Sequence, residues 1–268
     1  MVQKFHVNED FTKFYNEYGY VIVKDLFPRN ELERVCQDVY DLFDTRFVGI
    51  NKDKLSGYEL LILHYGTDTW RQCAKRMWDL VSVLGLATKP IVIEVLRKMG
   101  LGKPIISTRP EIRTDMPKDD RYRQPWHQDW RYAQGSYNAA TFWIPLQKVT
   151  IKNGTIDIIP KSHLLGLLET EELQNPRRFS ITDPRIGKMP YFPVELEMGE
   201  CVAFSQMLVH RSGENVTKSP RLSAQLRFAD YSDSPFIAEG YPIPASSELV
   251  WKNLPSERHM RGIYGMQQ

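Results

Sequence analysis

The sequence has little cysteine and no long apolar run. Its three cysteines, Cys36, Cys73 and Cys201, lie far apart and none belongs to a CxxC pair, which argues against both a disulfide framework and a zinc–thiolate site. We therefore expect reduced, buried cysteines in a cytoplasmic protein. An apolar stretch such as 81–87 is far too short to span a bilayer, and we find no run of signal-peptide length.

An excess of charge of one sign is also missing. The chain has 35 Lys and Arg against 33 Asp and Glu, a formal net charge of +2, which gives no support for a nucleic-acid or membrane-surface partner. Apolar residues make up 42% of the 268 residues, enough for a sizeable core, so disorder is excluded. We expect one domain over 1–268 that binds a small molecule. The oligomeric state does not follow from the sequence.

Helical patterns come first along the chain and strand patterns later. We expect a helix over 10–18, a strand over 20–23, a helix over 28–43, and a mainly helical buttress over 1–100 as a whole. Short β-like runs fill 101–230, which predicts a mostly β barrel or two-sheet jelly roll flanked by helices. Within that region a short helix is expected over 164–173. The Pro-rich tail, 231–268, carries aromatic residues and is expected to pack against the body.

The chain has six histidines, and only His127 has a carboxylate two residues away on a likely strand. In Trp126-His127-Gln128-Asp129-Trp130, an extended backbone would aim His127 and Asp129 to the same side. His210 follows a distant apolar strand that can lie across from His127. Two imidazoles and one carboxylate with open positions are the ligands of non-haem Fe(II) oxygenases. A zinc hydrolase with the same ligands is an alternative, and we interpret His64 and His163 as structural.

Two further residues, Arg221 and Ser212, are suited to binding a carboxylate. Arg221 lies eleven residues after His210, at the start of the next predicted strand, and a guanidinium binds a carboxylate bidentately. Ser212 is two residues past His210 and shares its face, so its hydroxyl could join Arg221. A zinc hydrolase gives no reason for this pair.

Four pieces of the sequence resemble the phytanoyl-CoA dioxygenase family. They are Glu17-Tyr18-Gly19-Tyr20-Val21-Ile22-Val23, then Trp126-His127-Gln128-Asp129, then Asn153-Gly154-Thr155 through Ile159-Pro160-Lys161-Ser162-His163, and finally His210-Arg211-Ser212-Gly213 with Arg221. Their order and approximate spacing match the family from about residue 10 to residue 230. One departure is Lys161, which stands where the family usually has glycine.

The resemblance implies a double-stranded β-helix core, also called a jelly roll or cupin-like fold, over 101–230. It implies Fe(II), 2-oxoglutarate and O2 as cofactor and cosubstrates. His127, Asp129 and His210 would be the iron ligands. Arg221 and Ser212 would hold the distal carboxylate of 2-oxoglutarate, beside Trp143.

The implied reaction is hydroxylation with release of succinate and CO2. Related halogenases have a small residue in place of the carboxylate, so Asp129 favours hydroxylation. Thr114 is a candidate for a further cosubstrate contact and Arg109 and Arg113 for substrate contacts, although a bulge would change which of them face inward.

Aromatic and cationic residues near the ligands, with Trp130 and Arg131 as candidates, predict a polar or sugar-like substrate. The tryptophans near the ligands could instead belong to the apolar core, and the arginines could form a solvated rim. A lipid or acyl-CoA substrate is the first alternative. A catalytically silent jelly-roll binding protein is the second, although it would need neither the ligands nor Arg221.

Overall fold

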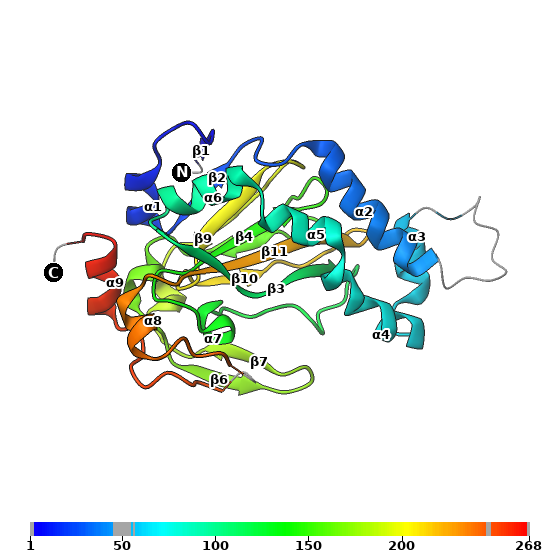
Figure 1. The fold of residues 1–268 in the computed structure, drawn as a ribbon. Helices are drawn as coiled ribbons and strands as arrows, with labels where there is room; N and C mark the ends of the chain where they lie inside the picture. The colour runs from blue at the N-terminus through cyan, green and yellow to red at the C-terminus, as the bar shows by residue number, and fades with distance from the viewer. Residues whose placement is uncertain (1–2, 45–54, 56, 245–247, 267–268) are drawn as a thin grey trace.

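Two facing β-sheets form the centre of the computed structural model, which describes residues 3–44, 55, 57–244 and 248–266 (Figure 1). The large sheet has the strand order β1-β2-β9-β4-β11-β3, the small sheet has the order β10-β5-β8, and β6 pairs with β7. The strands are β1 (Lys4–Phe5), β2 (Tyr20–Val23), β3 (Pro104–Asp115), β4 (Ala140–Pro145), β5 (Ile156–Ile158), β6 (Thr170–Leu173), β7 (Arg178–Ile181), β8 (Phe192–Pro193), β9 (Cys201–Ser205), β10 (His210–Ser212) and β11 (Arg221–Asp230). The predicted mostly β jelly roll with flanking helices is confirmed.

Three strands of the large sheet, β2, β4 and β9, are buried along their whole length, which explains their apolar sequences. In β2, Tyr20 and Ile22 pack in one apolar cluster with Ile156 and Ile158 of the small sheet. Val21 and Val23 pack in a second cluster, with the helices. Since successive strand side chains point to opposite faces, a strand between two layers is apolar throughout.

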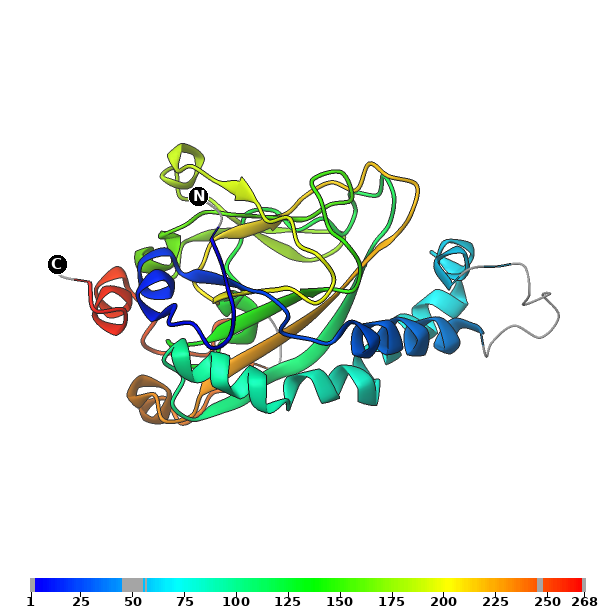
Figure 2. The ribbon, with the colours of Figure 1, turned by 90° about the horizontal axis from the view of Figure 1, so that it is seen from above.

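Helices cover the face of the large sheet that lies away from the small sheet. Figure 2 shows α5 and α6 running along β3 and β11, and α2 buries Leu32, Val35, Val39 and Phe43 at helical spacing. The helices are α1 (Thr12–Tyr18), α2 (Arg29–Asp44), α3 (Gly57–His64), α4 (Asp68–Ala74), α5 (Val81–Ala87), α6 (Pro90–Lys98), α7 (Trp130–Ala133), α8 (Ser234–Ala238) and α9 (Glu257–Ile263). No helix among the described residues is long and apolar enough to cross a membrane.

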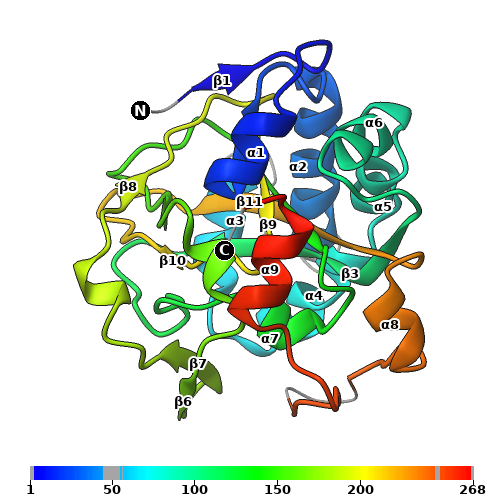
Figure 3. The same cartoon turned by 90° about the vertical axis from the view of Figure 1, so that its left-hand side faces the viewer.

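The C-terminal tail reaches back to the start of the chain. Figure 3 shows α9 beside α1, where the rings of Tyr15 and Tyr264 lie 5.8 Å apart. Trp251, Met260 and Tyr264 are buried in the same apolar cluster as the N-terminal helices. The tail therefore contributes to the core.

The helix predicted over 164–173 is wrong. A single 3₁₀ turn, Ser162–Leu165, ends at Gly166, and Thr170–Leu173 is a strand paired with Arg178–Ile181. At Gly166 φ is +75°, and a Cβ there would lie 2.6 Å from the backbone nitrogen of Glu257. The chain must turn at this glycine, which the apolar spacing of the segment does not reveal.

Lys161 occupies a left-handed backbone position, with φ of +68°. Its ammonium group lies 2.8 Å from Glu17 Oε1 and 4.9 Å from the centre of the Tyr18 ring. A glycine adopts this conformation without steric cost. Lysine at this position therefore strains the backbone, while its side chain gains two surface contacts.

Replacing Lys161 by glycine and by alanine separates these effects. Both variants lose the contacts with Glu17 and Tyr18, but only Lys161→Gly also relieves the left-handed strain. We expect the free energy of unfolding of Lys161→Gly to be about 1 kcal/mol higher than that of Lys161→Ala. Urea denaturation measures both values. Equal free energies of unfolding for the two variants would contradict the claim that the backbone is strained at position 161.

Candidate metal centre

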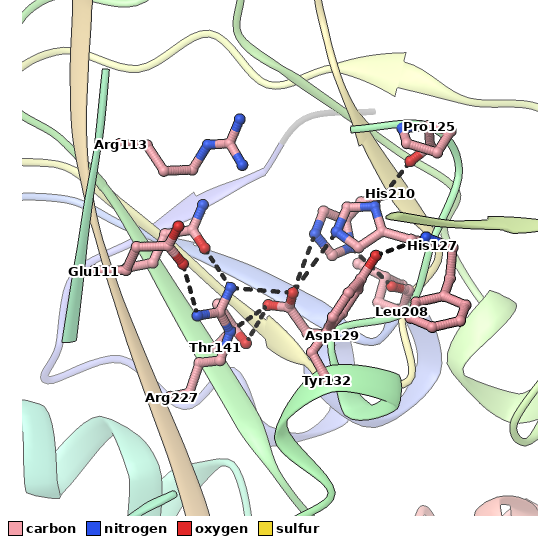
Figure 4. A network of polar contacts seen from close by, with 12 residues as sticks. Glu111, Arg113, Pro125, His127, Asp129, Tyr132, Thr141, Leu208, His210 and Arg227 are labelled. Carbon is pink, nitrogen blue, oxygen red and sulfur yellow. Dashed lines mark hydrogen bonds and ion pairs between the residues drawn. The ribbon is translucent and has the colours of Figure 1, made fainter. Parts of the chain in front are cut away.

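His127, Asp129 and His210 come together in a buried group. Their nearest potential ligand atoms all lie within 4.8 Å of one another. Nε2 of His127 is 3.7 Å, and Nε2 of His210 is 4.0 Å, from Oδ1 of Asp129. The three side chains point at one spot (Figure 4).

The backbone that produces this convergence differs from the predicted extended segment. His127 pairs with His210 in a single antiparallel bridge, with N–O distances of 2.9 and 3.1 Å, as predicted for strands lying across from each other. Asp129, however, has helical dihedral angles and precedes α7 directly. The two ligands therefore converge because the chain turns between them and not because both lie on one strand.

Both imidazoles are oriented by backbone carbonyls. Nδ1 of His127 lies 2.8 Å from the carbonyl oxygen of Pro125, and Nδ1 of His210 lies 3.1 Å from that of Leu208. A carbonyl oxygen can only accept, so each Nδ1 donates its proton, and Nε2 is the ring nitrogen that lies toward Asp129. Burial, with the neighbouring His127, lowers the pKa of His210 to about 3, so this ring is neutral at pH 7.

Asp129 is a buried carboxylate held by two donors. The Thr141 hydroxyl donates to Oδ2 at 2.7 Å, and Arg227 donates from Nε to Oδ2 at 3.2 Å and from Nη2 to Oδ1 at 3.3 Å. Burial alone would raise the pKa of Asp129, but Arg227 and the two imidazoles more than offset it, so this pKa lies well below its ordinary value. The carboxylate is therefore charged and fit to bind a cation.

This donor set suits a divalent transition metal. It offers two imidazole nitrogens and one carboxylate oxygen that lie close together, and such a facial set leaves further coordination positions open. The residues present therefore fit a non-haem iron.

A cavity of about 300 Å³, which we call the chamber, opens beside these three residues. A second hollow of about 450 Å³, the vestibule, shares Trp78, Glu111, Arg113 and Gln124 with it. The chamber is lined by Trp78, Thr108, Arg109, Glu111, Arg113, Gln124, His127, Asp129, Tyr132, Trp143, Ile156, His210, Ser212, Arg221, Gln225 and Arg227.

Arg221 is buried in the wall of the chamber, where Ser212 and Trp143 also lie. Its guanidinium forms an ion pair with Asp115 at 2.8 Å and donates to the Ser223 hydroxyl at 2.7 Å. It lies 5.3 Å from the centre of the Trp143 ring. Its Nε is buried and has no hydrogen-bond partner among the described residues. Because a buried donor without a partner is costly, the arrangement suits an added carboxylate.

Three of the predicted contact residues lie elsewhere. Thr114 is paired with Leu222 across β3 and β11, and it lines the vestibule and not the chamber. Trp130 is fully buried and packs on Trp251. Arg131 stacks on Phe179, 4.1 Å from the ring centre, also outside the chamber.

Of the other candidates, Arg109 and Arg113 do line the chamber. Arg109 lies at its rim, half exposed and paired with Asp79 at 3.0 Å. Arg113 bonds to Asp115 and to the carbonyl oxygen of Tyr122.

His64 and His163 lie outside the metal group. His64 stacks on Phe43. His163 bonds to the carbonyl oxygen of Asn16 at 3.0 Å, and burial lowers its pKa to about 4. The interpretation of both as structural agrees with these contacts.

Sequence reasoning missed Arg227, Glu111 and Gln225. Their signal was the alternation after Arg221: polar residues at 221, 223, 225 and 227 alternate with apolar residues at 222, 224, 226 and 228. On a strand, this period places Ser223, Gln225 and Arg227 on the face of Arg221. Glu111 follows by the same rule, because it pairs with Gln225.

Comparison with known proteins gives a family and several similar folds. A family model described as phytanoyl-CoA dioxygenase matches residues 15–223. The peroxisomal phytanoyl-CoA dioxygenase of Homo sapiens is 26% identical over 240 residues, covering 81% of this chain and 67% of that protein. A probable phytanoyl-CoA dioxygenase of Caenorhabditis elegans is 24% identical over 234 residues, covering 81% and 74%.

Two solved structures illustrate the similarity of fold. The structure of EctD from S. alaskensis with 2-oxoglutarate and 5-hydroxyectoine has a TM-score of 0.59 at 18% identity, covering 87% of this chain and 81% of that chain. The epimerase SnoN in complex with Fe3+, alpha ketoglutarate and nogalamycin RO has a TM-score of 0.54 at 21% identity, covering 92% and 93%.

Removing the carboxylate tests the metal centre. We expect Asp129→Ala to weaken Fe(II) binding by more than about a hundredfold, since loss of an outer partner alone costs tenfold to a hundredfold. Anaerobic calorimetric titration measures this, with Asp120→Ala, a change at a largely exposed carboxylate, as the control. Unchanged Fe(II) affinity in Asp129→Ala would remove this residue from the metal centre.

Proposed function

The chain belongs to the phytanoyl-CoA dioxygenase family of Fe(II)- and 2-oxoglutarate-dependent oxygenases, and on this basis we propose that it hydroxylates a small polar, sugar-like molecule. The other products of that reaction are succinate and CO2. The observation that carries the proposal for the substrate is the charge-balanced, polar lining of the chamber beside the metal centre.

We assign the iron to His127, Asp129 and His210, whose donor atoms converge. The distal carboxylate of 2-oxoglutarate would be held by Arg221, whose buried Nε has no hydrogen-bond partner among the described residues. Ser212 and Trp143, which line the same wall, would complete this cosubstrate site.

Bound iron and 2-oxoglutarate supply the oxidising chemistry when O2 is present. The chain's own residues orient the metal ligands and enclose the site. Pro125 and Leu208 hold the imidazoles through Nδ1, and Thr141 holds Asp129. Burial of all three ligands excludes bulk water from the metal, which strengthens the interactions of charged groups inside the chamber.

The charges around the chamber cancel. The four arginines that line the chamber are paired with four carboxylates: Arg109 with Asp79, Arg113 and Arg221 with Asp115, and Arg227 with Glu111 and Asp129. A divalent iron and a doubly negative cosubstrate also cancel each other. The chamber therefore has no surplus charge for a strongly anionic substrate, yet its wall is polar.

Two buried polar atoms in the chamber wall favour a substrate with hydroxyl groups. Thr108 Oγ1 and Gln124 Oε1 both have no hydrogen-bond partner among the described residues. A substrate hydroxyl can donate to Gln124 Oε1 and can donate to or accept from the Thr108 hydroxyl, while Trp78 and Tyr132 offer faces for a sugar ring.

The alternatives fit these observations less well. An acyl chain would desolvate Glu111, Arg113 and Arg227 without hydrogen bonds to replace the water, which argues against an acyl-CoA. A silent binding protein needs no convergent ligands. A zinc hydrolase leaves Arg221 unexplained.

We also propose a cytoplasmic location. Cys36, Cys73 and Cys201 are free thiols, as expected in a reducing compartment. Three of the curated relatives are named peroxisomal, so fractionation of native cells distinguishes the two compartments.

A substrate screen tests the proposed function. With Fe(II), O2 and 2-oxoglutarate supplied, we expect uncharged sugars and polyols to stimulate succinate release and acyl-CoA thioesters not to. The product should gain one oxygen by mass spectrometry. Stimulation by acyl-CoA alone, or a product of unchanged mass, would contradict the proposal.

With a substrate in hand, Arg113→Met should raise KM more than it lowers kcat, because Arg113 lines the chamber wall away from the metal ligands. Arg131→Met is the matched control, since its guanidinium stacks on Phe179 outside the chamber, and it should leave both constants unchanged. A raised KM in Arg131→Met with unchanged constants in Arg113→Met would show that the substrate binds outside the chamber.

A further inference from the structure

We propose that Thr141 and Arg227 are positioning residues that leave Asp129 a single oxygen for the metal. With Glu111, which holds Arg227, they form a group that we call the carboxylate clamp. This inference rests on the proposed function, because it concerns how an iron ligand is presented.

The count of lone pairs on Asp129 carries the inference. A carboxylate has about four acceptor positions, two on each oxygen. On Oδ2, Thr141 fills one position at 2.7 Å and Arg227 Nε fills the other at 3.2 Å. On Oδ1, Arg227 Nη2 fills one at 3.3 Å. The remaining position is on Oδ1, the oxygen that lies nearest both imidazole Nε2 atoms.

The clamp is built into the sheet. Thr141 of β4 and Arg227 of β11 are direct cross-strand partners, so their side chains stand on the same face. Figure 4 shows Arg227 between Glu111 and Asp129, with the imidazoles beyond. Glu111 lies 3.2 Å from Nη1 of Arg227, and Gln225 Oε1 accepts from Nη2. The guanidinium is thus held from both ends and cannot swing away from Asp129.

Holding Oδ2 has a consequence for cosubstrate binding. A carboxylate can bind a cation through one oxygen or through both. If Asp129 used both, it would occupy a position that a chelating 2-oxo acid needs. By saturating Oδ2, the clamp keeps that position open, so it should matter for 2-oxoglutarate binding more than for iron binding.

Two conservative changes test the clamp. Thr141→Val keeps the shape of the side chain and removes its hydrogen bond, and Arg227→Lys keeps the charge but not the two-point contact. Arg131→Lys is the matched control outside the chamber. For each protein, anaerobic titration measures the Kd of Fe(II) and then the Kd of 2-oxoglutarate, the latter from the visible charge-transfer absorption of the chelated 2-oxo acid.

For Thr141→Val we expect the Kd of 2-oxoglutarate to rise about tenfold, the effect of losing one hydrogen bond to a charged group. The Kd of Fe(II) should stay within about threefold, because the oxygen facing the imidazoles is not altered. Arg227→Lys should change the Kd of 2-oxoglutarate in the same direction and by more, and the control should match the wild-type protein.

Each result decides one question. If the wild-type protein with Fe(II) gives no absorption on adding 2-oxoglutarate, the proposed function fails. If the wild-type protein gives it and both variants match, the clamp fails alone. Equal weakening of Fe(II) and 2-oxoglutarate binding in Thr141→Val also overturns it, because the bond would then merely support the ligand. Should Arg227→Lys not fold, Thr141→Val decides.

Discussion

The buried ion pair between Asp129 and Arg227 is the interaction on which the centre of this protein depends. Asp129 has 2% of its side-chain surface exposed and Arg227 has 13%, so neither charge is stable there alone. Together with Glu111 and Thr141, they make the carboxylate permanently charged. They also tie the segment that carries His127 and Asp129 to the middle of the large sheet.

The fold makes this pair possible by dividing the large sheet into two kinds of face. One face packs uniformly against the helices. The other is apolar where β2, β4 and β9 meet the small sheet and charged where β3 and β11 extend beyond it. Arg221 and Arg227, six residues apart on β11, mark the two ends of that charged strip. In the proposed function, Arg221 binds the carboxylate of the cosubstrate and Arg227 holds Asp129, the proposed metal ligand. A single alternating strand thus serves both halves of the site.

Much of this was predictable from local patterns. The strand over 20–23 and the helix ended by Gly19 follow from short-range sequence, and the convergence of His127, Asp129 and His210 follows from motif and order. What failed depended on contacts distant in sequence. Gly166 ends a turn because α9 lies against it, and Thr114 lines the vestibule instead of the chamber. Trp130 and Arg131 were placed near a substrate by proximity in sequence, but the turn into α7 directs them into the core and onto Phe179. Arg227, in contrast, is predictable from the sequence, because the alternation of polar and apolar residues after Arg221 places both arginines on the same face of the strand.

We propose that the buried group of His127, Asp129 and His210 binds iron, and that Arg221 in the same chamber binds 2-oxoglutarate. Anomalous diffraction at the iron edge, from crystals grown anaerobically with Fe(II) and 2-oxoglutarate, tests this proposal most directly. We expect one iron peak about 2.1 Å from Nε2 of His127, Oδ1 of Asp129 and Nε2 of His210. We also expect a cosubstrate carboxylate on Arg221. An iron peak elsewhere, or 2-oxoglutarate density that does not reach Arg221, would contradict the proposal.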